Sequence, residues 1–178
     1  MSLSTERNPE CRPGGACEFQ ENLSALRQVD FFSSLPMEAL KVFAYLCARE
    51  SYHAGEYLFH QNDVEGKAFC ILDGELRLLL PAEGGEVQAT LYKAGDFLGG
   101  LSLLGDVRRL FSLKAETDAV CLVLTREKFK KTLDQFPGVM PRLLEAVAER
   151  VLAWENQFIH DHADLCAHCH ARLGASLV

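Results

Sequence analysis

Apolar residues follow three successive patterns along the chain. Near the N-terminus, Leu23, Leu26 and Val29 recur every three residues, and the stretch from Leu40 to Cys47 continues at similar spacing. This spacing is typical of amphipathic helices. Between residues 52 and 124 the apolar positions fall in short runs, and beyond residue 125 they return to helical spacing. The pattern predicts a β-rich middle with helices on either side.

The middle region reads as a series of short strands separated by turn residues. Glu75-Leu76-Arg77-Leu78 alternates with period two, as a half-buried strand does. Asp73-Gly74 is a hairpin signal, and a turn is predicted over residues 81–85. Strands are expected over residues 68–72, 75–78, 87–92, 111–115 and 120–124, with a broken one over 52–59. Short strands with turns every ~8–12 residues favour a barrel or jelly roll.

Capping residues mark where the flanking helices begin and end. Ser34 fits the N-cap of a helix that starts near Pro36, and Thr125 fits the N-cap of a helix with Glu127 in its first turn. Pro137-Gly138 ends that second helix. Residues 1–20 contain proline and glycine and few large apolar groups, which predicts a flexible N-terminal segment.

A long helix is predicted from near Pro141 onwards. Its apolar positions follow the 4, 3 spacing of a heptad seam: Met140, Leu144, Val147, Val151, Trp154, Phe158 and Leu165. The first turns of this stripe could pack on the chain's own β domain. Because a helix of some 25 residues is longer than that domain can cover, we favour pairing of two such helices in a homodimer.

Composition and charge exclude several classes of protein. The 178 residues are 48% hydrophobic and 24% charged, with a formal net charge of −7. This is the composition of a soluble domain, and an acidic chain lacks the basic surface that phosphate contacts require. No apolar run approaches the ~20 residues of a membrane span, and we find no signal peptide. A cytoplasmic location is therefore expected.

Several sequence words in the right order resemble the cyclic-nucleotide-binding domain family, which includes catabolite activator protein and the regulatory subunit of protein kinase A. The resemblance covers residues 29–150 and rests on these words: Phe32-Ser33-Ser34-Leu35, Gly55-Glu56-Tyr57-Leu58, Phe69-Cys70-Ile71-Leu72-Asp73-Gly74-Glu75-Leu76, Gly95-Asp96-Phe97-Leu98-Gly99 and Arg109-Leu110-Phe111-Ser112-Leu113-Lys114-Ala115.

The resemblance implies a mainly β fold of the α+β class: a jelly roll with flanking helices and a long C-terminal dimerisation helix. It divides the chain into the N-terminal segment 1–20, a binding domain over 21–137, and the long helix with its tail over 138–178. It also implies a sensory or regulatory module, not an enzyme. No nucleophile with a nearby base is evident, which agrees with that reading.

The family's phosphate-binding cassette corresponds to residues 99–111. A short helix that opens at Gly99 would present backbone N–H groups to an anion, and Arg109 would bind a phosphate with two hydrogen bonds. Leu98 and Leu103 would hold this helix against the barrel. The resemblance implies these ligand-binding residues: Leu98, Gly99, Gly100, Leu101, Arg109, Leu110 and Phe111.

This stretch departs from the family pattern in two ways. The glutamate that would accept from the ribose 2′-hydroxyl is Gly100 here, which weakens binding by roughly 1–3 kcal/mol. Leu110 and Phe111 replace two small residues, and one of them should face away from the pocket. A cyclic nucleotide, another anion, an apolar cofactor and an unoccupied pocket all remain open. Arg109 could instead form a surface salt bridge with Asp106 or Asp96.

Histidine and cysteine are concentrated between residues 160 and 170. On a continuing helix, one face would carry His162, Cys166, Cys169 and His170, which are ligand types for zinc or iron. Cys166-Ala167-His168-Cys169-His170 also matches the C-x-x-C-H motif for covalent haem attachment. A metal- or haem-linked redox sensor with a degenerate nucleotide pocket is therefore an alternative function. A polar helix end without any ligand is also possible.

Bacterial regulators of this family continue into a helix-turn-helix domain, whereas this sequence ends at Val178. We therefore expect no direct DNA binding, and a downstream protein partner that receives the signal. Three cysteines, Cys47, Cys70 and Cys121, lie within apolar patterns and are predicted to be core residues.

Overall fold

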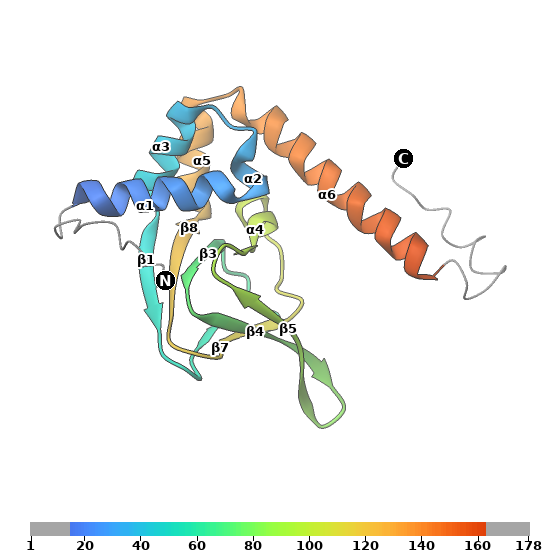
Figure 1. The fold of residues 1–178 in the computed structure, drawn as a ribbon. Coiled ribbons are helices and arrows are strands. Elements are labelled where there is room, and N and C mark those ends of the chain that lie inside the picture. The colour runs from blue at the N-terminus through green and yellow to red at the C-terminus, as the bar shows by residue number, and fades with distance from the viewer. Residues whose placement is uncertain (1–14, 163–178) are drawn as a thin grey trace, which may run out of the picture.

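The computed structural model describes residues 15–162, in which two four-stranded antiparallel sheets form a jelly roll beside a group of helices (Figure 1). The first sheet has the order β1-β8-β3-β6 and the second has the order β2-β7-β4-β5. The strands are β1 (Ala48–Tyr52), β2 (Tyr57–Phe59), β3 (Lys67–Asp73), β4 (Glu75–Ala82), β5 (Gly85–Lys93), β6 (Phe97–Leu98), β7 (Ser112–Ala115) and β8 (Ala119–Thr125). The predicted fold class is confirmed.

One predicted turn has a different role in the structure. Asp73-Gly74 does not close a hairpin, because β3 belongs to the first sheet and β4 to the second. Gly74 has a φ of +84°, and a Cβ atom there would lie 2.3 Å from the carbonyl oxygen of Asp118. The turn thus carries the chain between sheets. Residues 82–85 do close the expected hairpin, since Ala82 pairs with Gly85.

The helices are α1 (Gly15–Gln28), α2 (Asp30–Ser33), α3 (Met37–Leu46), α4 (Gly100–Leu104), α5 (Arg126–Gln135) and α6 (Val139–His162). Residues 15–20 were expected to be flexible, but they are helical, and Phe19 packs against the core. The predicted N-cap at Ser34 is wrong. Pro36 holds that position without a side-chain cap, and Ser34 ends α2 instead. Thr125 is confirmed as an N-cap and accepts from the N–H of Lys128.

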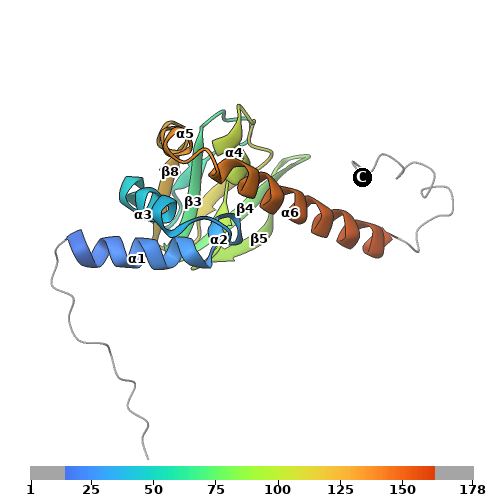
Figure 2. The same ribbon diagram turned by 90° about the horizontal axis from the view of Figure 1, so that it is seen from above.

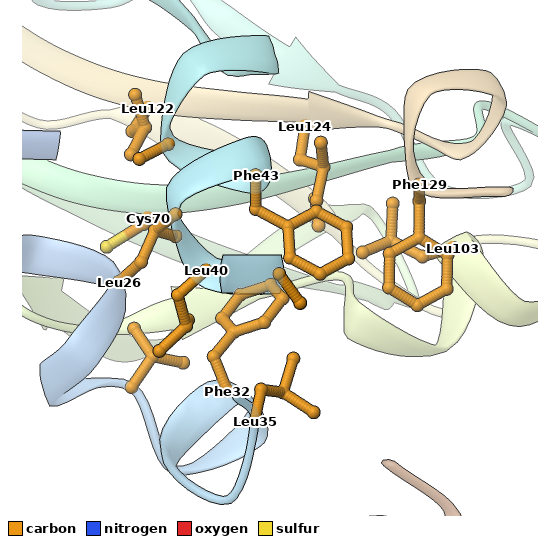
Figure 3. Packing of buried hydrophobic residues seen from close by; sticks show 14 of the residues in the cluster. Leu26, Phe32, Leu35, Leu40, Phe43, Cys70, Leu103, Leu122, Leu124 and Phe129 are labelled. Atoms are coloured by element: carbon orange, nitrogen blue, oxygen red, sulfur yellow. The ribbon is translucent and has the colours of Figure 1, made fainter. Parts of the chain in front are cut away.

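Two hydrophobic cores lie on opposite faces of the first sheet. The helix-side core packs α1, α2, α3 and α5 against the sheet and includes Phe32, Phe43 and Phe129 (Figure 3). The barrel core fills the interior of the jelly roll. Strand β3 contributes to both: Ala68 and Cys70 to the helix side; Phe69 and Ile71 to the barrel. A strand buried on both faces reads as one continuous apolar run, which is the pattern seen here.

Cys70 and Cys121 are buried free thiols, and Cys47 is a half-buried one. Burial raises the pKa of Cys47 and of Cys121 to about 12, and that of Cys70 to about 11. The prediction that these three cysteines are core residues is confirmed for Cys70 and Cys121, and Cys47 packs at the edge of the helix-side core.

Helix α6 starts on the domain and then extends away from it (Figures 1 and 2). Val139 and Leu143 are buried against the helix-side core, whereas Leu144 is 55% and Trp154 is 64% exposed. The contact with the domain therefore uses residues beside the predicted seam. Much of the seam itself is left uncovered. Among residues 15–162, no helix is long and apolar enough to cross a membrane.

Candidate functional site

The short helix α4 opens at a glycine that no other residue could replace without strain. Gly99 is its N-cap and has a φ of +83°. A Cβ atom at Gly99 would lie 2.7 Å from Nη1 of Arg109 and 2.8 Å from the carbonyl oxygen of Lys67. The absence of a side chain lets the backbone and the guanidinium approach each other closely. Leu98 is buried in the barrel core, as predicted, whereas Leu103 is buried in the helix-side core and not against the barrel.

The side chain of Arg109 points into the barrel, not to solvent. The residue is only 6% exposed, and its Nη2 donates to the carbonyl oxygen of Lys67 at 2.5 Å. Its guanidinium carbon lies 4.1 Å from the centre of the Phe59 ring and 5.9 Å from that of Phe69. Such cation–π contacts stabilise a cation that has lost water. The arginine is thus held at the barrel core by aromatic rings and a backbone carbonyl.

The charge of Arg109 has no ion-pair partner within residues 15–162, and its buried Nε has no hydrogen-bond partner there. Burial lowers the pKa of Arg109, and the nearby carboxylates of Glu65 and Asp63 partly oppose this effect. The alternative of a surface salt bridge is wrong. Asp106 pairs with Arg126, and Asp96 accepts from the N–H of Lys93 at 2.8 Å. A buried cation that forms no ion pair among the described residues is suited to binding an anion.

The two residues after Arg109 point in different directions. Leu110 is 77% exposed. Phe111 packs against the barrel core, with its ring centre 5.6 Å from that of Phe59. Leu110 therefore faces solvent, whereas Phe111 faces the barrel core. Only the phenyl ring takes up interior space.

Gly100 and Leu101 line a cavity whose lining does not include Arg109. A cavity of about 370 Å³ lies between α2, α4 and α6, and its lining includes Gly100, Leu101 and Val147. A Cβ atom at Gly100 would lie 3.0 Å from the Phe97 ring. The structure therefore separates these two predicted ligand residues from the contacts of Arg109.

Some residues of the site were not predicted from the sequence. Phe59 and Phe69 read as ordinary core residues, and the carbonyl of Lys67 carries no side-chain signal. Arg126 was also missed. Its Nε donates to the carbonyl oxygen of Ser102 at 2.7 Å, which ties α4 to the start of α5. A basic residue directly after the N-cap Thr125 was the only available hint, because the helix dipole disfavours a cation there.

The predicted metal or haem ligands lie at or beyond the edge of the described residues. His162 is the last residue of α6, and Cys166, Cys169 and His170 fall outside. Within residues 15–162, no cluster of His, Cys, Asp and Glu could hold a metal ion. The tail site stays a prediction.

Comparison with known proteins relates this chain to one protein family. Residues 49–136 match the cyclic nucleotide-binding domain family. The cAMP-dependent protein kinase regulatory subunit of Emericella nidulans is 36% identical over 119 residues, which are 66% of this chain and 28% of that protein. Cyclic GMP-dependent protein kinase 2 of Mus musculus is 31% identical over 134 residues, 72% of this chain and 17% of the kinase.

The chain thus spans less than a third of the length of these relatives. Among solved structures, the catabolite activator protein of Thermus thermophilus is similar with a TM-score of 0.63 and 25% identity. The match covers 76% of this chain and 63% of that protein. The sequence words, the two-sheet jelly roll and the buried arginine beside Gly99 agree with these matches. Residues 49–136 of this chain therefore belong to the cyclic nucleotide-binding domain family.

Proposed function

We propose that this protein is a sensory module that binds a small anionic ligand at Arg109, with a cyclic nucleotide as the first candidate, and signals through α6. The observation that carries the proposal is the buried, unpaired guanidinium. Taking a cation out of water costs several kcal/mol, and an anion at close range offsets that cost. Arginine also presents a planar pair of donors that matches a phosphate.

The relatives support a cyclic nucleotide as that anion, since their names refer to cAMP- and cGMP-dependent kinases. Gly100 provides no carboxylate for the ribose, so we expect weaker binding than in a domain with the full cassette. The loss of one buried acceptor corresponds to roughly 1–3 kcal/mol.

The contacts of α4 provide a route from ligand to α6. Arg126 links Ser102 of α4 to the start of α5. At the other end of α5, the N–H of Val139, the first residue of α6, donates to the carbonyl oxygen of Phe136 at 2.9 Å. A ligand that binds one position of α4 more tightly would therefore shift α5 and α6 together.

The exposed seam of α6 would pair with the same seam of a second copy of the chain, and the shift would change how the two helices pack. A downstream protein would then recognise the changed pair. The net charge of −7 favours a protein over DNA as the next partner.

The test is calorimetric titration of the purified protein with cyclic AMP and cyclic GMP. Arg109→Ala should weaken binding by roughly a hundredfold or more, because a charge-assisted pair is lost. Arg108→Ala removes the same charge from the exposed neighbouring residue and serves as the matched control. It should change affinity only slightly. Arg109→Lys keeps the charge and covers the case in which the alanine variant does not fold.

Absence of binding by the unmodified protein at millimolar nucleotide would contradict the cyclic-nucleotide proposal. Equal loss of affinity in the Arg109 and Arg108 variants would contradict the specific role of Arg109.

A further inference from the structure

Three polar side chains occupy inner-face positions of the first sheet, where a jelly roll usually carries apolar residues. Glu50 pairs with Cys121, and Tyr52 pairs with Ala119; both partners belong to the barrel core. Lys67 lies two residues before Phe69 on β3 and so points to the same face. Arg49, directly before Glu50 on β1, points the other way and binds Glu21 of α1.

These three side chains contact one another and form what we call the inner polar cluster (Glu50, Tyr52 and Lys67). The hydroxyl of Tyr52 donates to Oε2 of Glu50 at 2.6 Å. Nζ of Lys67 lies 4.0 Å from the same oxygen, with both side chains 36% exposed. The cluster therefore holds the Glu50 carboxylate in one orientation and leaves part of it open to solvent. A carboxylate has two oxygens and about four acceptor positions, so it can accept further hydrogen bonds.

The inner polar cluster and Arg109 lie at the same end of the barrel. The carbonyl oxygen of Lys67 is the acceptor for Nη2 of Arg109. Phe69, two residues along β3, packs beneath the same guanidinium. The carboxylate of Glu65 interacts electrostatically with both Tyr52 and Arg109. Lys67 therefore contacts both groups, the buried cation through its backbone carbonyl and the Glu50 carboxylate through its ammonium group.

We infer that Glu50 is a specificity-determining residue, whose carboxylate accepts a hydrogen bond from a hydroxyl or amino group of the ligand whose anionic group binds Arg109. This inference rests on the proposed function. Gly100 carries no acceptor, and Glu50 supplies a carboxylate from a different strand. Lys67 beside it offsets the repulsion between this carboxylate and the ligand's anion.

The ligand class that fits is an anion with a hydrogen-bond donor on the same rigid frame. Cyclic AMP has two such donors, the ribose 2′-hydroxyl and the exocyclic amine of adenine. An acceptor that is buried with no donor is costly, so a site of this kind discriminates against analogues that lack the donor.

The experiment compares Glu50→Ala and Glu50→Gln with the unmodified protein by calorimetric titration. Glu83→Ala removes the same charge from the exposed β4–β5 turn and is the matched control. With cyclic AMP, Glu50→Ala should lose at least about tenfold in affinity and Glu50→Gln somewhat less, because the amide oxygen still accepts. Glu83→Ala should bind as the unmodified protein does. Thermal unfolding verifies that each variant is folded. If the alanine variant does not fold, Glu50→Gln provides the test, because glutamine keeps the shape of glutamate.

Two analogues identify the donor. If Glu50 accepts from the ribose, 2′-deoxy cyclic AMP should bind the unmodified protein weakly and show no further loss in Glu50→Ala. If Glu50 accepts from the adenine amine, the cyclic monophosphate of purine riboside should behave in that way.

The outcomes separate this inference from the proposed function. Binding that depends on Arg109 but is unchanged in both Glu50 variants would overturn the role of Glu50 and leave the proposed function standing. A loss in Glu83→Ala equal to that in Glu50→Ala would reduce the effect to net charge and would also overturn it. No binding by the unmodified protein would overturn the proposed function itself, and with it the role of Glu50.

Discussion

At the scale of single residues, the position of the Arg109 side chain depends on the absence of a side chain at Gly99. The guanidinium occupies the space where a side chain at Gly99 would start, and the backbone at Gly99 has a positive φ. Gly95 has a similar φ of +96° but nothing within 4 Å of its Cβ position. Comparing alanine substitutions at the two glycines therefore distinguishes the cost of backbone strain from the effect of displacing Arg109.

We predict that Gly99→Ala weakens cyclic-nucleotide binding at least tenfold, because the new methyl group pushes Arg109 from its place between the rings and the Lys67 carbonyl. Both Gly99→Ala and Gly95→Ala should lose roughly 1–2 kcal/mol of folding free energy from the left-handed conformation, and Gly99→Ala should lose more. Urea unfolding and titration measure the two effects. Equal affinities in the two variants would show that Arg109 does not need the open space at Gly99.

At the scale of elements, Arg126 determines where α4 sits. Its Nε bonds the carbonyl oxygen of Ser102, and its backbone N–H donates to the carbonyl oxygen of Gly66 at 2.6 Å. The ion pair with Asp106 adds little, because Asp106 is 81% exposed. One side chain thus joins the ligand-binding helix to the helix that leads to α6.

We predict that Arg126→Ala lowers the free energy of unfolding by about 2 kcal/mol, since a hydrogen bond from a charged donor to a buried carbonyl is lost. Amide hydrogen exchange in α4 should become faster. Lys131→Ala is the control on the same helix: its pair with Glu127, at 3.0 Å, is exposed and should contribute no more than about 0.5 kcal/mol. Unchanged exchange in α4 would refute the positioning role of Arg126.

At the scale of the whole molecule, the outer part of α6 has an apolar side that stays partly exposed within residues 15–162. Val151 is 37%, Leu152 41% and Trp154 64% exposed, and the indole of Trp154 stacks on Phe158 with ring centres 5.5 Å apart. A pair of such helices would bury this side, which is the usual arrangement for a heptad seam.

We predict that the protein is a dimer at micromolar concentration and that Trp154→Glu shifts it to the monomer. Tyr45→Glu introduces the same charge at a 79% exposed aromatic residue on α3 and should leave the dimer intact. Light scattering after size exclusion measures the mass. A monomeric unmodified protein would disprove the pairing, and dissociation in both variants would assign the effect to added charge.

The local patterns of the sequence located most of the elements and identified the fold family. Period-two alternation located β4, the turn residues located the β4–β5 hairpin, and Thr125 marked the start of α5. These features depend on residues that are neighbours in the chain, so the sequence carries them directly. The ordered words also identified the position of Arg109 and the need for a glycine at position 99.

Contacts between distant residues were decided only by the tertiary structure. The turn at Asp73-Gly74 looks the same whether it joins paired strands or two sheets, and the packing of both sheets selects the second. The same holds for Arg109, whose acceptor is a backbone carbonyl 42 residues away. Nothing in the sequence marks Glu50 or Lys67 as inner-face residues, because alternation alone does not say which face is inside. Their contact with each other across the first sheet follows from strand register, which long-range hydrogen bonds determine and no local pattern encodes.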